Sequence, residues 1–308
     1  TNTTITGNRS DVNNSGGEQG GGIQSTANLV TVLNTIVAGN FVGTGTTAND
    51  LSGDVINVSS LNNLIGDPAS AGGLTHGASG NIVGQDGSPS RVTLDVNTVL
   101  RPLAFNGGTT QTHVLRTGSP AIDAGLDSEA DEKFDQRGKP FDRQSGQVDI
   151  GATEVQLFPA SFFVVTTTVD ELNYDNNAVS LREALLSAAG SAGSETIKFA
   201  STLTGSTSST LNLALGELQI TDSLTIHWQG TTPLTINAGG KSRVFNVLGG
   251  SEIDVTLQGL TVTGGLTTQD NPIDSDNAHS GGGIRFDSTG TLKLISSSVS
   301  GNKTEGQR

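Results

Sequence analysis

The sequence TLNLALGELQITDSLTIHWQGTTPLTINAGGKSRVFNVLGGSEIDVTLQGLTVT, residues 210–263, shows the clearest structural pattern in the chain. Its large apolar residues mostly alternate with Thr, Ser, Asn and other polar residues, as in β-strands that bury one face. The positions expected to face the core are Leu213, Leu215, Leu218, Ile220, Leu224, Ile226, Trp228, Leu234, Ile236, Val244, Val247, Val255, Leu257, Leu260 and Val262. The alternation predicts several short strands, and it also permits an antiparallel sandwich.

Turn sequences that recur along the chain favour stacked parallel strands over the sandwich. A β-branched residue followed by one or two small residues and Gly-Asn occurs at 5–8, 36–40 and 299–302, with a looser copy at 260–265. Gly-Gly-Gly-Ile occurs twice as well, each time after a polar, acid-containing loop. Short strands with repeated turns are typical of repeat architectures. We therefore predict an all-β fold, a right-handed parallel β-helix (solenoid) with one short capping amphipathic helix.

One segment, 180–189, has the pattern of a helix. Ser180 followed three residues later by Glu183 forms a capping-box sequence at its start. Leu181, Ala184 and further apolar residues share one face, and Gly190 can end the helix. We expect this helix to cover an open end of the solenoid, where apolar surface and unpaired strand edges would otherwise be exposed.

The middle of the chain resembles two segments of bacterial right-handed parallel β-helix surface proteins. Ser180-Leu181-Arg182-Glu183-Ala184 looks like their N-terminal CSLREA segment, with Val179 in place of its Cys. Residues 117–154 resemble their choice-of-anchor Q end, in TGSPAIDAG, DQRG and DIGATE. The resemblance implies a large secreted or cell-surface protein, often without an assigned activity.

The end-like segment precedes the start-like segment, which predicts the domain organisation. Residues 1–155 are expected to be the C-terminal part of one β-helix, 156–161 a junction, and 162–308 the N-terminal part of the next, beginning with a strand at 162–169 and the capping helix. A tandem array would show this order, and so would a natural circular arrangement. The spacing of Ile and Val anchors across a join of residue 308 to residue 1 favours the array, with other copies of the same unit as partners.

Composition excludes several classes of protein. The 30 acidic and 16 basic residues give a formal net charge of −14, so we expect no nucleic-acid partner. The chain has no Cys, which excludes disulfides, zinc thiolates and Cys nucleophiles. No stretch approaches the ~18 apolar residues of a membrane span. An acidic, Cys-free chain rich in Thr, Gly and Asn is typical of bacterial secreted and surface proteins, and we expect an extracellular or cell-surface location.

Two sets of charged residues are candidate sites. Calcium is the ligand that the Gly-rich acidic loops favour, with Asp270, Asp274, Asp276 and Asp11 as candidate ligands, because calcium takes six to eight oxygens. Neither loop has the EF-hand spacing, and ordinary solvated loops remain the alternative. A second set, at the junction, consists of Asp123, Asp135, Arg137, Asp149 and Glu154. There we expect a structural role, with the acids paired to Arg137, Lys139 or Arg143.

The expected function is a non-catalytic, structural unit of an extracellular or cell-surface filament, assembled head to tail. A surface adhesin that binds glycans or cell-surface components is one alternative. A polysaccharide lyase or glycoside hydrolase is another, because many parallel β-helices cleave polysaccharides. Enzymes of the second kind need two carboxylates ~5–9.5 Å apart on rigid strands, whereas the acids here concentrate in loops, and Trp228 alternates with core residues.

Overall fold

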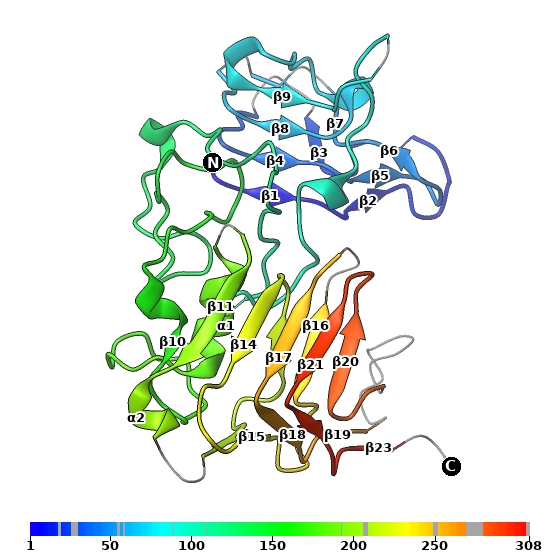
Figure 1. Ribbon diagram of the computed structural model, residues 1–308. Coiled ribbons are helices and arrows are strands. Elements are labelled where there is room, and N and C mark those ends of the chain that lie inside the picture. The colour runs from blue at the N-terminus through cyan, green and yellow to red at the C-terminus, as the bar shows by residue number, and fades with distance from the viewer. Residues whose placement is uncertain are drawn as a thin grey trace. The chain divides into compact units, whose positions relative to one another are not determined.

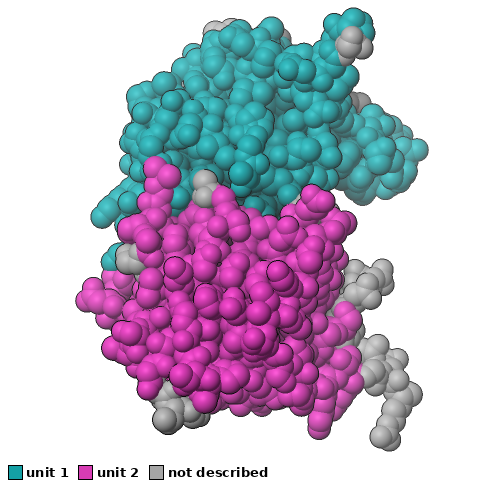
Figure 2. Space-filling model, in the orientation of Figure 1, with its two compact units in different colours: residues 1–103, 108–156 teal, residues 104–107, 157–308 magenta. Residues whose placement is uncertain are grey.

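The computed structural model describes residues 1–17, 20–25, 30–53, 56–57, 59–87, 89–108, 110–191, 193–205, 209–248, 252–268 and 280–305. These form two compact units, coloured separately in Figure 2. Unit 1 comprises residues 1–103 and 108–156, and unit 2 comprises residues 104–107 and 157–308. Strands predominate in both, as the all-β prediction requires (Figure 1). The assignment of the two parts to successive β-helices stays a prediction.

Unit 2 is built from short strands in parallel sheets. Its strands are β10 (Val164–Val165), β11 (Glu195–Phe199), β12 (Thr210–Asn212), β13 (Leu218–Ile220), β14 (Leu224–His227), β15 (Leu234–Asn237), β16 (Phe245–Leu248), β17 (Val255–Gln258), β18 (Leu260–Thr263), β19 (Leu266–Thr267), β20 (Ile284–Asp287), β21 (Leu292–Ile295), β22 (Ser298–Val299) and β23 (Lys303–Thr304). The sheet orders are β10-β11-β14-β17-β21, β12-β15-β18-β22, β13-β16-β20 and β19-β23. The chain therefore adds one strand to each sheet in turn and then returns to the first sheet. We call each such round a pass, and each pass lies beside the previous one.

The register between passes keeps apolar residues on the inside. Ile226 pairs with Leu257, which pairs in turn with Leu294, and Val262 pairs with Val299. Because side chains alternate across a strand, this register places one set of apolar residues in a single core. All these pairs are parallel, so the antiparallel sandwich is not the architecture of this unit.

The predicted core of 210–263 is confirmed at every position but one. Leu215 is 56% exposed, whereas the other fourteen positions are buried. The prediction fails there because Leu215 lies in the turn between β12 and β13. The backbone N–H groups of Ala214 and Leu215 donate to the Asp170 carboxylate in this turn, which interrupts the alternation of the strands.

Unit 1 has shorter strands and longer connections. Its strands are β1 (Thr4–Ile5), β2 (Arg9–Ser10), β3 (Ile23–Ser25), β4 (Ile36–Val37), β5 (Phe41–Val42), β6 (Thr47–Ala48), β7 (Leu51–Gly53), β8 (Leu64–Ile65) and β9 (Ile82–Val83). The sheet orders are β1-β4-β8-β9, β2-β5-β6 and β3-β7, and β5–β6 is the one antiparallel pair among the described strands. Val37, Ile65 and Val83 occupy equivalent positions and are buried.

A column of asparagines ties these passes to an irregular segment of unit 1. Asn2, Asn34 and Asn62 each adopt a positive φ three residues before the last strand residue of their pass. Their side-chain amides donate to the carbonyl oxygens of Glu129, Leu126 and Ala124, respectively. Residues 124–129 therefore run across three successive passes and bind each one.

The predicted helix is present as α1 (Leu181–Ala189), which belongs to unit 2. A one-turn helix, α2 (Ser201–Thr204), and short 3₁₀ helices complete the elements: η1 (Pro68–Ser70), η2 (Ala78–Gly80), η3 (Val96–Thr98), η4 (Asp127–Glu129) and η5 (Ala160–Phe163). The strand expected over 162–169 is reduced to β10, because η5 occupies its first part. Within the described ranges, no helix has the length and apolarity to cross a membrane.

Candidate functional site

The structure brings four of the five junction residues together inside unit 1. Asp135, Arg137, Asp149 and Glu154 are all buried, although they come from turns rather than strands. Asp123 is exposed at the margin, where its backbone N–H donates to Asp149 Oδ1 at 2.7 Å. The cluster lies in a segment with almost no regular backbone pairing, so its side chains must satisfy the backbone groups.

Asp135 and Arg137 form the first half of this cluster. Their side chains are fully buried, and Arg137 Nη2 lies 2.6 Å from Asp135 Oδ2. Arg137 Nη2 also donates to the Glu154 carbonyl oxygen at 2.5 Å, and the Glu154 N–H donates to Asp135 Oδ2 at 2.8 Å. The guanidinium stacks on the Phe141 ring, with 3.9 Å from Cζ to the ring centroid. The pair is thus held by hydrogen bonds and by an aromatic face.

Arg143, Glu154 and Asp149 form the second half. Arg143 Nη2 lies 2.9 Å from Glu154 Oε2 and donates to the Asp149 carbonyl oxygen at 3.1 Å. The Glu154 carboxylate also accepts the N–H groups of Ser145 and Asp149. Asp149 Oδ2 in turn accepts the N–H of Val155 at 2.6 Å. Each carboxylate therefore closes a turn by accepting N–H groups that no strand satisfies.

Burial shifts the acidity of both carboxyls in this half. Desolvation raises the pKa of Glu154 to about 7, with the nearby negative charge of Asp149 adding to the effect and Arg143 opposing it. Desolvation likewise raises the pKa of Asp149 to about 6, against hydrogen bonds from Val155 and Asp123. A pair of raised carboxyl pKa values can mark an active site. Here the carboxylate oxygens are enclosed by the chain's own N–H groups and Arg143, so the arrangement is suited to holding the turns together.

The predicted helix-start residues form a second polar cluster in unit 2. The Ser180 hydroxyl accepts the Glu183 N–H, and Glu183 Oε2 accepts the Ser180 N–H, so the capping box is complete. Leu181 and Ala184 are buried in the core. Arg182 pairs with Asp170 at 2.8 Å and also donates to the carbonyl oxygens of Gly216 and Glu217.

Asp170 is the residue of this cluster that the sequence did not single out. Burial works to raise its pKa, but hydrogen bonds from Arg182 and from the N–H groups of 214–215 outweigh it, and the pKa is lowered. The acid lies ten residues before the capping box in an otherwise ordinary turn. Only the folded chain shows that it links the helix to the turn before β13.

The candidate calcium ligands are not assembled in the described structure. Asp11 lies in a loop and accepts the N–H groups of Ser15 and Gly16, an ordinary turn arrangement. Asp270, Asp274 and Asp276 lie outside the described residues. Across the described ranges, no group of three or more His, Cys, Asp or Glu residues is placed to hold a metal ion.

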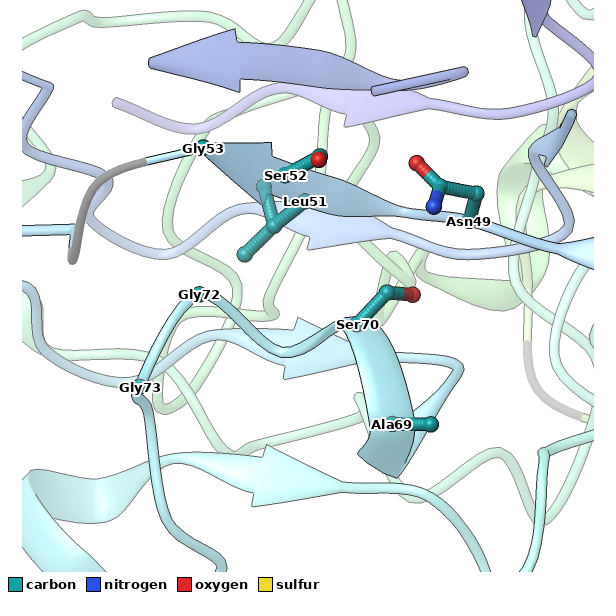
Figure 3. A pocket seen from close by; sticks show the side chains of 8 residues that line it. All are labelled: Asn49, Leu51, Ser52, Gly53, Ala69, Ser70, Gly72 and Gly73. Carbon is teal, nitrogen blue, oxygen red and sulfur yellow. The ribbon is translucent and has the colours of Figure 1, made fainter. Parts of the chain in front are cut away.

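A surface hollow of about 370 Å³ lies between β7 and the η1 turn of unit 1 (Figure 3). It is lined by Asn49, Leu51, Ser52, Gly53, Ala69, Ser70, Gly72 and Gly73. The polar groups there already bind the chain itself: Asn49 Oδ1 accepts the Gly20 N–H, and Ser70 Oγ donates to Asp67. The lining contains no ionisable side chain, so the hollow offers no acid–base pair.

The aromatic residue that could have served as a sugar platform is buried. Trp228 is 3% exposed, packs edge-on against Phe199, and donates from Nε1 to the Thr232 carbonyl oxygen. Its expected position in the core is confirmed. Trp228 therefore presents no aromatic face to a glycan.

Among the described residues, each unit has one end covered by another element and one end whose strands pair on one side only. In unit 2, α1 packs on the first strands, whereas Leu294 and Val299 in the last pass are 45% and 42% exposed. Their partners in the preceding pass, Leu257 and Val262, are buried. The residues that form the core of earlier passes therefore face solvent in the last one.

In unit 1 the covered end is the last in chain order and the end paired on one side only is the first. At its far end, Arg91 donates from Nε and Nη2 to the carbonyl oxygens of Val83 and Gly84, so the edge of β9 is capped. At its near end, β1 pairs with β4 on one side only among the described strands, and Ile5 is half-buried. The strand paired on one side only is therefore the first of its sheet in unit 1, whereas in unit 2 the exposed residues lie in the last strands.

Comparison with known proteins does not assign the chain to a family. No protein-family model matches it, and neither the curated proteins nor the solved structures include a significant match.

Proposed function

We propose that this protein is a non-catalytic, extracellular structural unit, a right-handed parallel β-helix that assembles end to end with other copies into a filament. The observation that carries the proposal is a strand edge at one end of each unit that pairs with no other described strand. A free edge with exposed core residues is a template for pairing with another chain, and proteins ordinarily block such edges. Here α1 and Arg91 block the other two ends.

The order in which the chain visits its sheets supports the β-helix. In unit 2, β14, β15 and β16 are followed by β17, β18 and β20, each parallel to its counterpart in the previous pass. We propose a right-handed winding, because crossover connections between parallel strands are right-handed in about 98% of cases.

The composition supports an extracellular role. The chain has no Cys and therefore does not depend on the redox state of its surroundings. Thr occupies outward positions in strands such as β14, β15 and β18. The net charge of −14 would limit sideways clumping of filaments while leaving apolar ends to associate.

Electron microscopy of the purified protein over a range of concentrations tests the proposal. We expect rods that lengthen with concentration, and fibre diffraction with a repeat of about 4.8 Å along the rod axis. Discrete particles of one chain at every concentration would contradict assembly. Saturable binding of a glycan by such particles would indicate the adhesin, and release of products from uronic-acid polymers would indicate the polysaccharide-degrading enzyme.

A further inference from the structure

We infer that residues 296–305 of unit 2 dock in parallel register on residues 2–11 of unit 1 in a second copy of this chain. This inference rests on the proposed function and names the surfaces that would perform it. The first segment contains β22 and β23, and the second contains β1 and β2. We call them the lower edge and the upper edge.

The two edges have matching sequences. Residues 296–305 are SSSVSGNKTE and residues 2–11 are NTTITGNRSD. Gly and Asn are identical, and the other positions hold residues of the same kind: hydroxyl or amide, β-branched, cationic or acidic. Chains that present such equivalent segments can stack them like successive passes of one solenoid.

Their backbones match as well. Ser296 and Asn2 both have a positive φ, 48° and 51°, as do Gly301 and Gly7, at 68° and 72°. A left-handed conformation at both places fixes the same two bends around the strand. The two edges are therefore the same local structure. The lower edge is paired with the pass before it, and the upper edge is paired with the pass after it.

Within each unit, one rule describes how such a segment binds the preceding pass. Asn302 accepts the Gly265 N–H at 2.8 Å and donates to the Val262 carbonyl oxygen at 3.0 Å. Asn40 does the same in unit 1, accepting the Asn8 N–H and donating to the Ile5 carbonyl oxygen. The asparagine thus bridges the turn and the strand of the pass before it.

Applied once more, the same rule joins two copies. Asn8 of the second copy would accept the Asn302 N–H and donate to the Val299 carbonyl oxygen of the first. The backbone follows the pattern of Ala38 on Ile5 and of Ser300 on Val262, which places the Thr6 N–H on the Val299 carbonyl oxygen. Val299 would then lie opposite Ile5, in the register of Val262 and Val299.

This register would bury the apolar residues that the last pass leaves exposed. Val299 is 42% exposed, whereas its equivalents Ile236 and Val262 are fully buried under the next pass. Ile5 is half-buried, whereas its partner Val37 is fully buried. A second copy of the chain would therefore bury both Val299 and Ile5, as their equivalents in the other passes are buried.

Two pairs of like charges along the two edges oppose association. Lys303 would lie opposite Arg9, and Glu305 opposite Asp11, and like charges directly opposite each other are unfavourable. The Arg9 guanidinium is turned towards its own unit, where it donates to the carbonyl oxygens of Gly43 and Gly45. Added salt should therefore strengthen the contact.

Cross-linking tests the register. Because the chain has no native Cys, only the introduced Cys residues can form disulfides. Ser300 and Thr6 would lie opposite each other, at a strand spacing of about 4.8 Å that a disulfide can bridge. Single variants Thr6→Cys and Ser300→Cys are prepared separately, mixed and oxidised. We expect a covalent dimer in the mixture and little dimer from either variant alone. The slipped pair, Thr6→Cys with Ser298→Cys, is the matched control and should cross-link poorly.

The double variant and light scattering separate the possible failures. Thr6→Cys/Ser300→Cys in one chain should give a ladder of multimers. Cross-linking within a single chain would overturn the second copy as occupant. Association of the unmodified protein without the Thr6–Ser300 cross-link would overturn the register and leave the proposed function standing. A protein that stays monomeric at all concentrations and salt conditions would overturn both.

A charge reversal tests the register through a gain of association. Lys303→Glu places an acid opposite Arg9, and we expect half-association at a roughly three- to tenfold lower protein concentration. Lys198→Glu, on the solvent side of β11, changes the net charge equally and should not promote association. An unchanged or weakened association of Lys303→Glu would overturn the proposed register.

Discussion

Glu154 shows how unit 1 uses buried charge in place of regular strand pairing. Its carboxylate is enclosed by Arg143 and by the N–H groups of Ser145 and Asp149. Burial of an ion pair is costly, and removing only one partner leaves an uncompensated charge. The cluster therefore holds unit 1 together only as a complete set.

Removing Arg143 should lower the free energy of unfolding of unit 1 much more than removing the charge of Glu154. Arg143→Met leaves Glu154 buried without its cation, and we expect a loss of about 3–5 kcal/mol in the free energy of unfolding of unit 1. Adding Glu154→Gln to this variant should restore part of the loss. Fluorescence would follow unit 2, because Trp228 and Tyr174, the only Trp and Tyr of the sequence, both lie there. Unfolding of unit 1 is therefore measured by far-UV circular dichroism in urea. Equal stabilities of the single and double variants would contradict the coupling.

The raised acidities of Glu154 and Asp149 predict a pH dependence of unit 1. Their folded pKa values of about 7 and about 6 exceed the ordinary values, so the folded state binds more protons than the unfolded state between about pH 4 and pH 7. The stability from these groups is fully present below their unfolded pKa and is lost as pH rises through the folded pKa. We expect unit 1 to be on the order of 1–3 kcal/mol more stable at pH 5 than at pH 8. Glu154→Gln should reduce this difference, and a stability that rises over this range would refute the assignment.

The element scale is best represented by α1, where two serines provide a matched pair. The Ser180 hydroxyl caps the helix and donates to the Glu171 carbonyl oxygen. The Ser187 hydroxyl, in the same helix, is buried without a hydrogen-bond partner among the described residues. The same substitution should therefore act in opposite directions at the two positions.

We expect Ser180→Ala to destabilise unit 2 by about 1–2 kcal/mol, because the capping bond is lost. Ser187→Ala should be neutral or stabilising by up to about 1 kcal/mol, because Ala favours the helix and no unsatisfied hydroxyl remains buried. Trp228 fluorescence in urea reports unit 2 alone and measures both changes. Similar losses for the two variants would show that simple packing, and not capping, governs the helix.

For the whole molecule, assembly and folding should be linked. If the uncovered edges associate, the assembled state is stabilised by mass action, and the thermal midpoint should rise with protein concentration. The rise should be larger at higher salt, because both the net charge of −14 and the like charges at the edges are screened. Differential scanning calorimetry at several concentrations measures it. A midpoint independent of concentration would indicate a chain that folds and stays alone.

Local patterns in the sequence were enough to predict the β character, the core positions of 210–263 and the capped helix. These features depend on residues two to four positions apart, whose side chains share a face or a turn. The exception, Leu215, fails for a non-local reason, because Asp170 lies 45 residues away and holds its turn. The short strand β10 has a similar origin, since η5 replaces part of the expected strand.

The sequence by itself determined that the chain alternates strands and glycine-rich turns, that it carries a capped helix, and that its junction acids and arginines are a related set. Only the tertiary structure decided which of them meet, because Asp135 and Glu154 approach across 19 residues of irregular chain. It also decided which strands stay uncovered. Val262 and Val299 occupy the same kind of sequence, and one is buried while the other is exposed because burial depends on whether another pass lies beside it.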